Sequence, residues 1–166
     1  MKLILSVFWN ICLLRRGPEF VPTHPLFVAS VVIADILLSL FVRVQYGGEA
    51  PLMEIATFTL VTMATLATIT WLALSLRGVI RRFPATITAM FGCDLLFTLL
   101  IALLIPLAGG VRGAVSILGG LILIWSIAVN GFILHRAMNI TIFVGILSAF
   151  GMALVAATLA TSATAH

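Results

Sequence analysis

Two carboxylic acids lie inside long apolar segments of the chain, and they are the residues with the clearest potential for chemistry. Asp35 lies in segment 26–44 and Asp94 in segment 85–107, each nine residues after the start of its segment. If both segments are helices that run in the same direction, the two acids lie at one depth, roughly 13 Å from the helix start. Two carboxyl groups at one depth in a medium of low dielectric can share a proton or hold a cation.

Hydroxyl and indole groups are expected near the same depth. Each acid is followed four residues later by a hydroxyl on the same helical face, Ser39 after Asp35 and Thr98 after Asp94. Trp125 is too deep for an interfacial aromatic belt, so its indole N–H needs a buried partner. We therefore expect one polar layer across the bundle, formed by Asp35, Asp94, Trp125, Thr65, Thr68 and Ser148.

The polar layer has three interpretations that the sequence leaves open. The first is a proton or cation site built on Asp35 and Asp94. The second is structural: both acids are protonated or hydrogen-bonded to neighbouring polar groups and only fix the register of the helices. The third is a docking surface for a partner protein. No arginine or lysine is expected mid-span to neutralise the acids.

The other reactive residue types predict no catalytic, cofactor or metal site. His24, His135 and His166 lie outside the middle of any apolar segment, and no two share a helix at a spacing of four residues. Cys12 and Cys93 are isolated and are expected to be small buried hydrophobes. The chain has no glycine-rich phosphate loop after a strand and no nucleophile elbow. We expect a non-enzymatic protein without a cofactor.

A stripe of small residues marks the last apolar segment. Gly145, Ala149, Ala153, Ala157 and Thr161 recur at every fourth position. Such a stripe lets a second helix approach backbone to backbone. The face predicts helix packing, either within the bundle or against a partner or a second copy.

The composition requires a membrane. Of the 166 residues, 63% are hydrophobic and 8% charged, and the mean hydropathy is +1.30. A soluble domain carries about 25% charged residues. The nine basic residues lie at the ends of apolar runs, where membrane topology places them, so we do not expect nucleic-acid binding.

The expected fold is an all-α integral membrane bundle of five spans. Loops rich in glycine, proline or arginine separate the apolar runs. The predicted spans are 26–44, 55–76, 85–107, 114–134 and 140–161, followed by a short outer tail at 162–166.

The first 25 residues are expected to form an interfacial helix and a linker. Residues 3–14 are apolar but too few to span, and Lys2, Ser6 and Asn10 form a narrow polar stripe. A signal peptide is the competing interpretation, but no cleavage site follows the apolar run. Whether this helix lies in the interface or packs in the bundle stays open. The three prolines in 17–25 predict an extended linker.

The distribution of basic residues predicts the orientation. With a cytoplasmic N-terminus, seven basic residues face the cytoplasm and only Arg43 and Arg112 face outward. The C-terminus is then periplasmic. The seven residues are Lys2, Arg15, Arg16, Arg77, Arg81, Arg82 and Arg136. Their loops are expected to attract anionic lipid headgroups.

Four short motifs resemble small, uncharacterised bacterial inner-membrane proteins of the Yip1-like superfamily. The motifs are Leu13-Leu14-Arg15-Arg16-Gly17-Pro18-Glu19, Leu76-Arg77-Gly78, Arg82-Phe83-Pro84-Ala85-Thr86-Ile87-Thr88-Ala89 and Trp125-Ser126-Ile127-Ala128-Val129-Asn130-Gly131. The resemblance implies five spans, a cytoplasmic N-terminus and a bacterial inner-membrane location. It implies no catalytic or binding residue. The link of eukaryotic Yip1 proteins with small GTPases is not expected to extend to this chain, which has no long cytoplasmic N-terminal region.

Two functions follow as expectations. The first is an accessory or scaffold subunit that packs against other membrane proteins or forms a homo-oligomer. The alternative is a small proton- or cation-coupled transporter or channel that uses Asp35 and Asp94.

Overall fold

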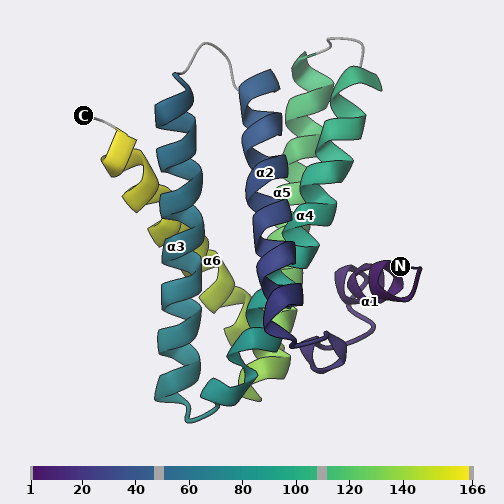
Figure 1. Cartoon of the computed structure of the whole chain (residues 1–166), viewed down its shortest axis with the longest axis vertical. Helices are drawn as coiled ribbons and strands as arrows, with labels where there is room; N and C mark the ends of the chain where they lie inside the picture. Colours follow the sequence, from purple (N-terminus) through teal and green to yellow (C-terminus); the bar gives the residue numbers. More distant parts are fainter. Residues whose placement is uncertain (1, 47–50, 108–111, 165–166) are drawn as a thin grey trace.

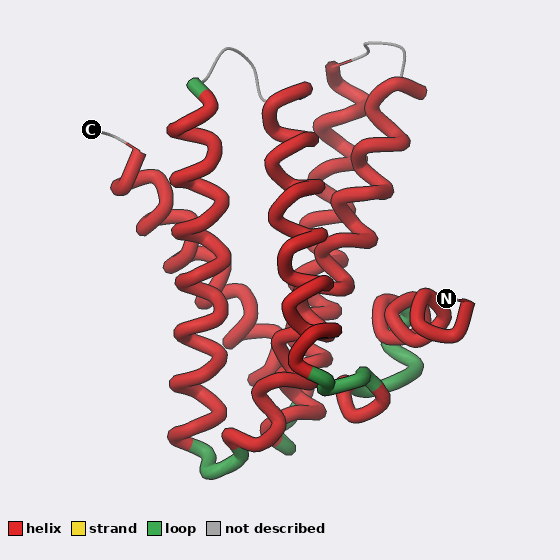
Figure 2. Tube along the Cα trace, viewed as in Figure 1, coloured by secondary structure: helices red, strands yellow, loops and turns green. Residues whose placement is uncertain are grey.

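The computed structural model describes residues 2–46, 51–107 and 112–164, which form six α-helices and two short 3-10 turns. The elements are α1 (Lys2–Cys12), η1 (Pro18–Phe20), α2 (Pro25–Tyr46), α3 (Leu52–Leu76), η2 (Ile80–Arg82), α4 (Phe83–Leu107), α5 (Arg112–Met138) and α6 (Ile142–Thr164). The described residues contain no strand (Figure 2). Helices α2 to α6 are long and apolar enough to cross a membrane, so the expected all-α bundle of five spans is confirmed.

The five long helices form a ring whose order differs from the order of the chain. Helix α2 packs against α4, α4 against α5, α5 against α6, α6 against α3, and α3 closes the ring against α2 (Figure 1). Large apolar side chains such as Leu26, Leu76 and Phe143 point outward and are more than 70% exposed. An apolar exterior of this extent suits contact with lipid rather than water.

The ends of the helices differ from the sequence prediction in small ways. Helix α6 continues through Thr164, so most of the expected tail at 162–166 is helical. Residues 165–166 of the expected tail lie outside the described part of the chain. Residues 47–50 and 108–111, in the two expected outer loops, lie outside it as well. Helix α5 ends at Met138, and the positive φ of 52° at the next residue, Asn139, reverses the chain into α6.

Helix α1 packs against the side of the bundle. It lies across the spanning helices beside α4 and α5 (Figure 1). Phe8, Ile11 and Cys12 are buried, whereas Trp9 is 60% exposed. The Phe8 ring occupies the space in which a Cβ atom on Gly92 would lie. Since Gly92 is nine residues into α4, α1 docks about 13 Å along that helix rather than at its end.

Gly92→Leu is expected to push Phe8 away and release α1 from the bundle. The Cβ atom alone would lie 2.6 Å from Cδ1 of Phe8, a distance that requires the ring to move. Cys12, now 5% exposed, should then react with N-ethylmaleimide, and mass spectrometry distinguishes its adduct from one on Cys93. Gly120→Leu is the matched control because a Cβ there meets nothing within 4 Å. Unchanged protection of Cys12 in Gly92→Leu would contradict this docking.

The linker after α1 is not wholly extended as predicted. Pro18–Phe20 form one 3-10 turn, closed by the N–H of Val21, which donates to the Pro18 carbonyl at 3.1 Å. Proline suits the first position of such a turn because it has no N–H to leave unpaired. Pro18 and Val21 are buried, and η1 packs against α4 and α5.

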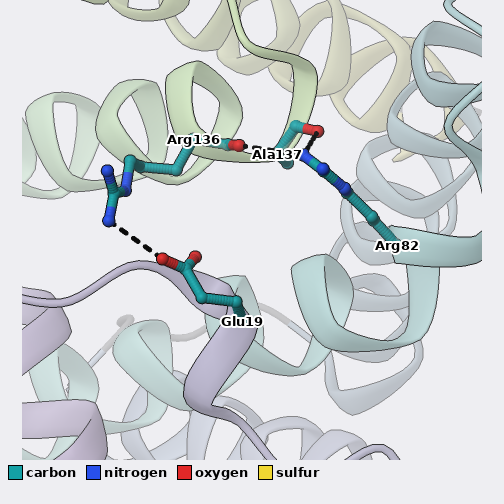
Figure 3. Close-up of polar contacts among 4 residues, drawn as sticks. All are labelled: Glu19, Arg82, Arg136 and Ala137. Carbon is teal, nitrogen blue, oxygen red and sulfur yellow. Dashed lines mark hydrogen bonds and ion pairs between the residues drawn. The ribbon is translucent and has the colours of Figure 1, made fainter.

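Arginine side chains hold η1 and η2 to α5 at the end of the bundle that carries η1. Arg136 donates to Oε1 of Glu19 at 2.9 Å, and Arg82 donates to the carbonyl of Ala137 at 3.0 Å (Figure 3). The second contact supplies a donor to the last turn of α5, whose carbonyls have no partner within the helix. The ion pair is 47% and 48% exposed, so it contributes about 1 kcal/mol or less and chiefly positions the linker.

Candidate functional site

Asp35 is the most unusual residue in the membrane-spanning region. Its side chain is completely buried between α2 and its neighbours, with 0% exposure. Neither carboxylate oxygen has a hydrogen-bond partner within the described residues. Burying a polar group without a partner costs about 1–3 kcal/mol, and more if the group is charged. Burial of the Asp35 side chain therefore costs free energy that no hydrogen bond within the described residues offsets.

Asp94 lies on α4, which packs closely against α2, the helix that carries Asp35. Unlike Asp35, it is partly exposed and lines two cavities. The smaller cavity has a volume of 80 Å³ and the larger one 410 Å³. Ser39 and Arg43 line both cavities with Asp94, so these three side chains form the boundary between the two spaces.

One face of α2 supplies most of this site. Asp35, Ser39 and Arg43 follow one another at intervals of four residues, which places them on one side of the helix. From α4, Asp94 and Thr98 have the same spacing, and both line the larger cavity. The two polar faces meet because α2 and α4 pack against each other.

Arg43 was predicted to lie on the outer side, and no arginine or lysine was expected in the middle of a span. The structure places Arg43 with Asp94 on the lining of both cavities. Arg43 is within α2, and its guanidinium carbon lies 4.7 Å from the centre of the Phe58 ring on α3. A cation over an aromatic face is attracted by the electrons of the ring. Within the described residues no ion pair joins Arg43 to Asp94. The sequence did offer one indication of this placement: Arg43 follows Asp35 by eight residues, which puts the two residues on the same side of α2.

Asn130 is another polar residue of this region that the sequence analysis did not single out. It lies on α5 and lines the smaller cavity, where its Oδ1 atom is buried and has no hydrogen-bond partner within the described residues. The smaller cavity thus collects polar groups from four helices. These groups are Ser39 and Arg43 of α2, Thr59 and Thr62 of α3, Asp94 of α4 and Asn130 of α5.

Trp125, Thr65 and Ser148, which the sequence placed in the same layer, line neither cavity. The indole N–H of Trp125 donates to the Cys12 carbonyl at 3.0 Å and so ties α1 to α5. Thr65 and Ser148 are partly buried on α3 and α6. Residue counting gives the depth of a side chain but not the direction in which it points, since successive residues turn by about 100°.

Thr68, the sixth member of the predicted layer, does not join the site either. Its hydroxyl donates to the Ala64 carbonyl of its own helix at 2.7 Å. This bond satisfies the hydroxyl without any other helix. Of the predicted layer, Asp94 alone lines the two cavities, while Asp35 is buried on α2, the helix that packs against α4.

The small-residue face of α6 is only partly covered. Gly145 and Ala149 are buried, whereas Ala153 is partly exposed and Ala157 is exposed. The buried line continues instead through Met152, Ala156 and Ala160. Four residues turn a helix by about 400°, so a stripe of fourth positions rotates about 40° per step away from a straight contact. The inner half of the stripe packs against α5, and the outer half diverges from the buried line.

The charges of the site leave one unit unbalanced. When all three groups are ionised, Asp35, Asp94 and Arg43 carry one net negative charge. One proton or one monovalent cation neutralises the group. The 410 Å³ cavity gives Asp94 space through which such a species can arrive, whereas Asp35 is enclosed.

Comparison with protein-family models, with curated proteins and with solved structures finds no match to this chain. The resemblance to Yip1-like proteins therefore stays a prediction.

Proposed function

We propose that this multi-pass membrane protein is a small proton- or cation-coupled transporter or channel in which Asp35 and Asp94 bind the coupling ion. The observation that carries the proposal is the fully buried carboxylate of Asp35, which has no hydrogen-bond partner within the described residues. Ionisable residues within membrane spans cost free energy, and those that are present commonly mark ion or proton pathways.

The proposed sequence of steps follows the two cavities. An ion enters the 410 Å³ cavity and reaches the carboxylate of Asp94. Arg43, which lines the same space, keeps a second cation from entering while the first is bound. The ion then passes between Asp94 and Asp35, since a low-dielectric medium favours sharing one positive charge between two carboxylates. Ser39, which lies one turn after Asp35 on α2, lines the same cavities as Asp94.

The proposal includes an orientation in a bacterial inner membrane with a cytoplasmic N-terminus. The turns that carry Arg77, Arg81, Arg82 and Arg136 lie at one end of the bundle, and the ends of α2 and α4 that face away from them carry few basic residues (Figure 1). Basic residues concentrate on the cytoplasmic side of membrane proteins. Each basic side chain near the surface also attracts anionic lipid by about 1 kcal/mol.

Asp35→Asn and Asp94→Asn are each expected to abolish ion flux, because an amide can neither release a proton nor neutralise a cation. The measurement is the change of internal pH, or the uptake of radioactive sodium, in liposomes that contain the purified protein. Glu19→Gln is the matched control, since it makes the same acid-to-amide change at an exposed position outside the spans. Undiminished flux in both folded variants would reject the proposal.

A second candidate, the accessory subunit, is favoured by one observation. The outer half of the small-residue face of α6 is open, with Ala157 and Thr161 exposed. A second helix could approach closely there. Purification from the native membrane in mild detergent separates the two candidates. A stoichiometric membrane-protein partner supports the accessory subunit, and flux from the protein alone supports the transporter.

A further inference from the structure

A third cavity, of 350 Å³, lies at the end of the bundle that carries η1, between that turn, the start of α4 and the end of α5. None of its lining residues lines the two cavities beside Asp94. Small-molecule sites have volumes of about 300–1,000 Å³, so this space is large enough for a ligand group. Five of its eight lining residues are polar, namely Glu19, Arg82, Thr86, Arg136 and Asn139.

The charge of this lining favours an anion. When all three groups are ionised, the guanidinium groups of Arg82 and Arg136 and the carboxylate of Glu19 leave one net positive charge. The other lining residues are uncharged. An anion with one negative charge neutralises the cavity, whereas a cation would add to its charge. A phosphodiester is such an anion, and the planar fork of donors on arginine matches the oxygens of a phosphate group.

Both arginines keep donors for such a group. Arg82 uses Nη1 for the carbonyls of Arg136 and Ala137, at 3.4 and 3.0 Å. Arg136 uses Nη2 for Oε1 of Glu19 at 2.9 Å (Figure 3). A guanidinium has five N–H donors, so Nε and one terminal nitrogen of each arginine make no hydrogen bond within the described residues. The existing contacts position the two side chains without using up their capacity to bind.

The first turn of α4 lines the same cavity. Ala85 and Thr86 are the third and fourth residues of this helix, and the N–H groups of the first four residues have no carbonyl partner within a helix. The hydroxyl of Thr86, which is fully buried, donates to the Arg82 carbonyl at 2.8 Å and so fixes the backbone of Arg82 against α4. The positive end of the helix dipole therefore adds to the charge of the arginines, and phosphate groups bind in such a setting.

We propose that this cavity binds one phosphodiester group, held by the guanidinium groups of Arg82 and Arg136 at the start of α4. The group belongs either to the headgroup of a membrane lipid or to a soluble phosphodiester, since both present the same oxygens. A defined site differs from the general attraction of basic loops for anionic lipid. Arg81, the neighbour of Arg82 in η2, does not line the cavity, so the site requires one of these two arginines and not the other.

Native mass spectrometry of the full chain, released from a non-ionic detergent, tests the site with dioctanoyl phosphatidylglycerol as the probe. We expect one tightly bound lipid per chain. Arg82→Gln and Arg136→Gln are each expected to raise the Kd roughly tenfold or more, which corresponds to about 1.4 kcal/mol. Arg81→Gln is the matched control, because it removes the same charge from an exposed residue outside the cavity. We expect it to leave the Kd nearly unchanged, since salt screens exposed charges.

Competition with glycerophosphoglycerol, the same headgroup without acyl chains, separates the two sources of the phosphodiester. Displacement of the lipid by this compound supports a soluble ligand, and its failure to displace a lipid that still requires both arginines supports a membrane lipid. If Arg82→Gln does not fold, Arg136→Gln carries the test, because the ion pair that it removes is exposed.

Two results would overturn the inference. The first is a Kd that is unchanged in the folded Arg82→Gln and Arg136→Gln variants, or binding of neither probe by the wild type. The second is an equal loss of binding in Arg81→Gln, which would show that only the general attraction of the basic loops acts. Neither result bears on Asp35 or Asp94, so the proposed ion path is tested separately.

Discussion

Gly131→Leu is expected to prevent α5 and α6 from packing and to leave most of the protein unfolded in detergent. A Cβ atom at position 131 would lie 2.5 Å from Cα of Ile146 and 2.7 Å from its backbone nitrogen. Backbone atoms of a helix cannot rotate aside as a side chain can, so the two helices must separate. On the other side of the contact, a Cβ on Gly145 would collide with the Gly131 carbonyl.

The expected loss is about 3 kcal/mol or more, at the upper end of the effects of overpacking. Thermal unfolding followed by circular dichroism measures it. Gly151→Leu is the matched control, since it makes the same substitution on α6 where a Cβ meets nothing within 4 Å. Equal melting temperatures for the two variants would show that α5 and α6 do not meet at Gly131.

Asp35→Leu is expected to raise the stability of the protein while it abolishes ion flux. Leucine has nearly the branched shape of aspartate and removes the two buried oxygens that have no partner within the described residues. Replacing such a group by an apolar group of similar shape is stabilising, here by about 1–3 kcal/mol. A gain of stability with a loss of activity is the signature of a residue retained for function.

The measurement is the free energy of unfolding at low sodium concentration, where a bound ion does not stabilise the wild type. Glu19→Leu replaces an exposed acid and is expected to produce no gain. If Asp35→Leu instead destabilises the protein, the carboxyl contributes contacts that hold the helices in register, which is the structural interpretation of the acids.

The site was partly predictable because an acid within an apolar run is visible in the sequence. Asp35 and Asp94 were identified only because an acid within a membrane span costs free energy. The structure brings the helices that carry them together. Arg43 and Asn130 were missed for different reasons. Arg43 lies near the end of α2, where a basic residue has an ordinary topological explanation, and only the fold directs its side chain back over Phe58. Asn130 became notable only when its Oδ1 proved to be buried without a partner within the described residues.

The sequence by itself determined that the chain has five spans, where each span lies to within a few residues, and which two acids lie within spans. These properties depend on the composition of contiguous segments and on the free energy of transferring them to lipid. Only the tertiary structure decided that α1 docks beside Gly92, that α2 packs on α4, and that Trp125 bonds to α1. Which face of one helix meets which face of another depends on rotation about the helix axis and on close contacts between distant residues. Depth along a span does not contain that information.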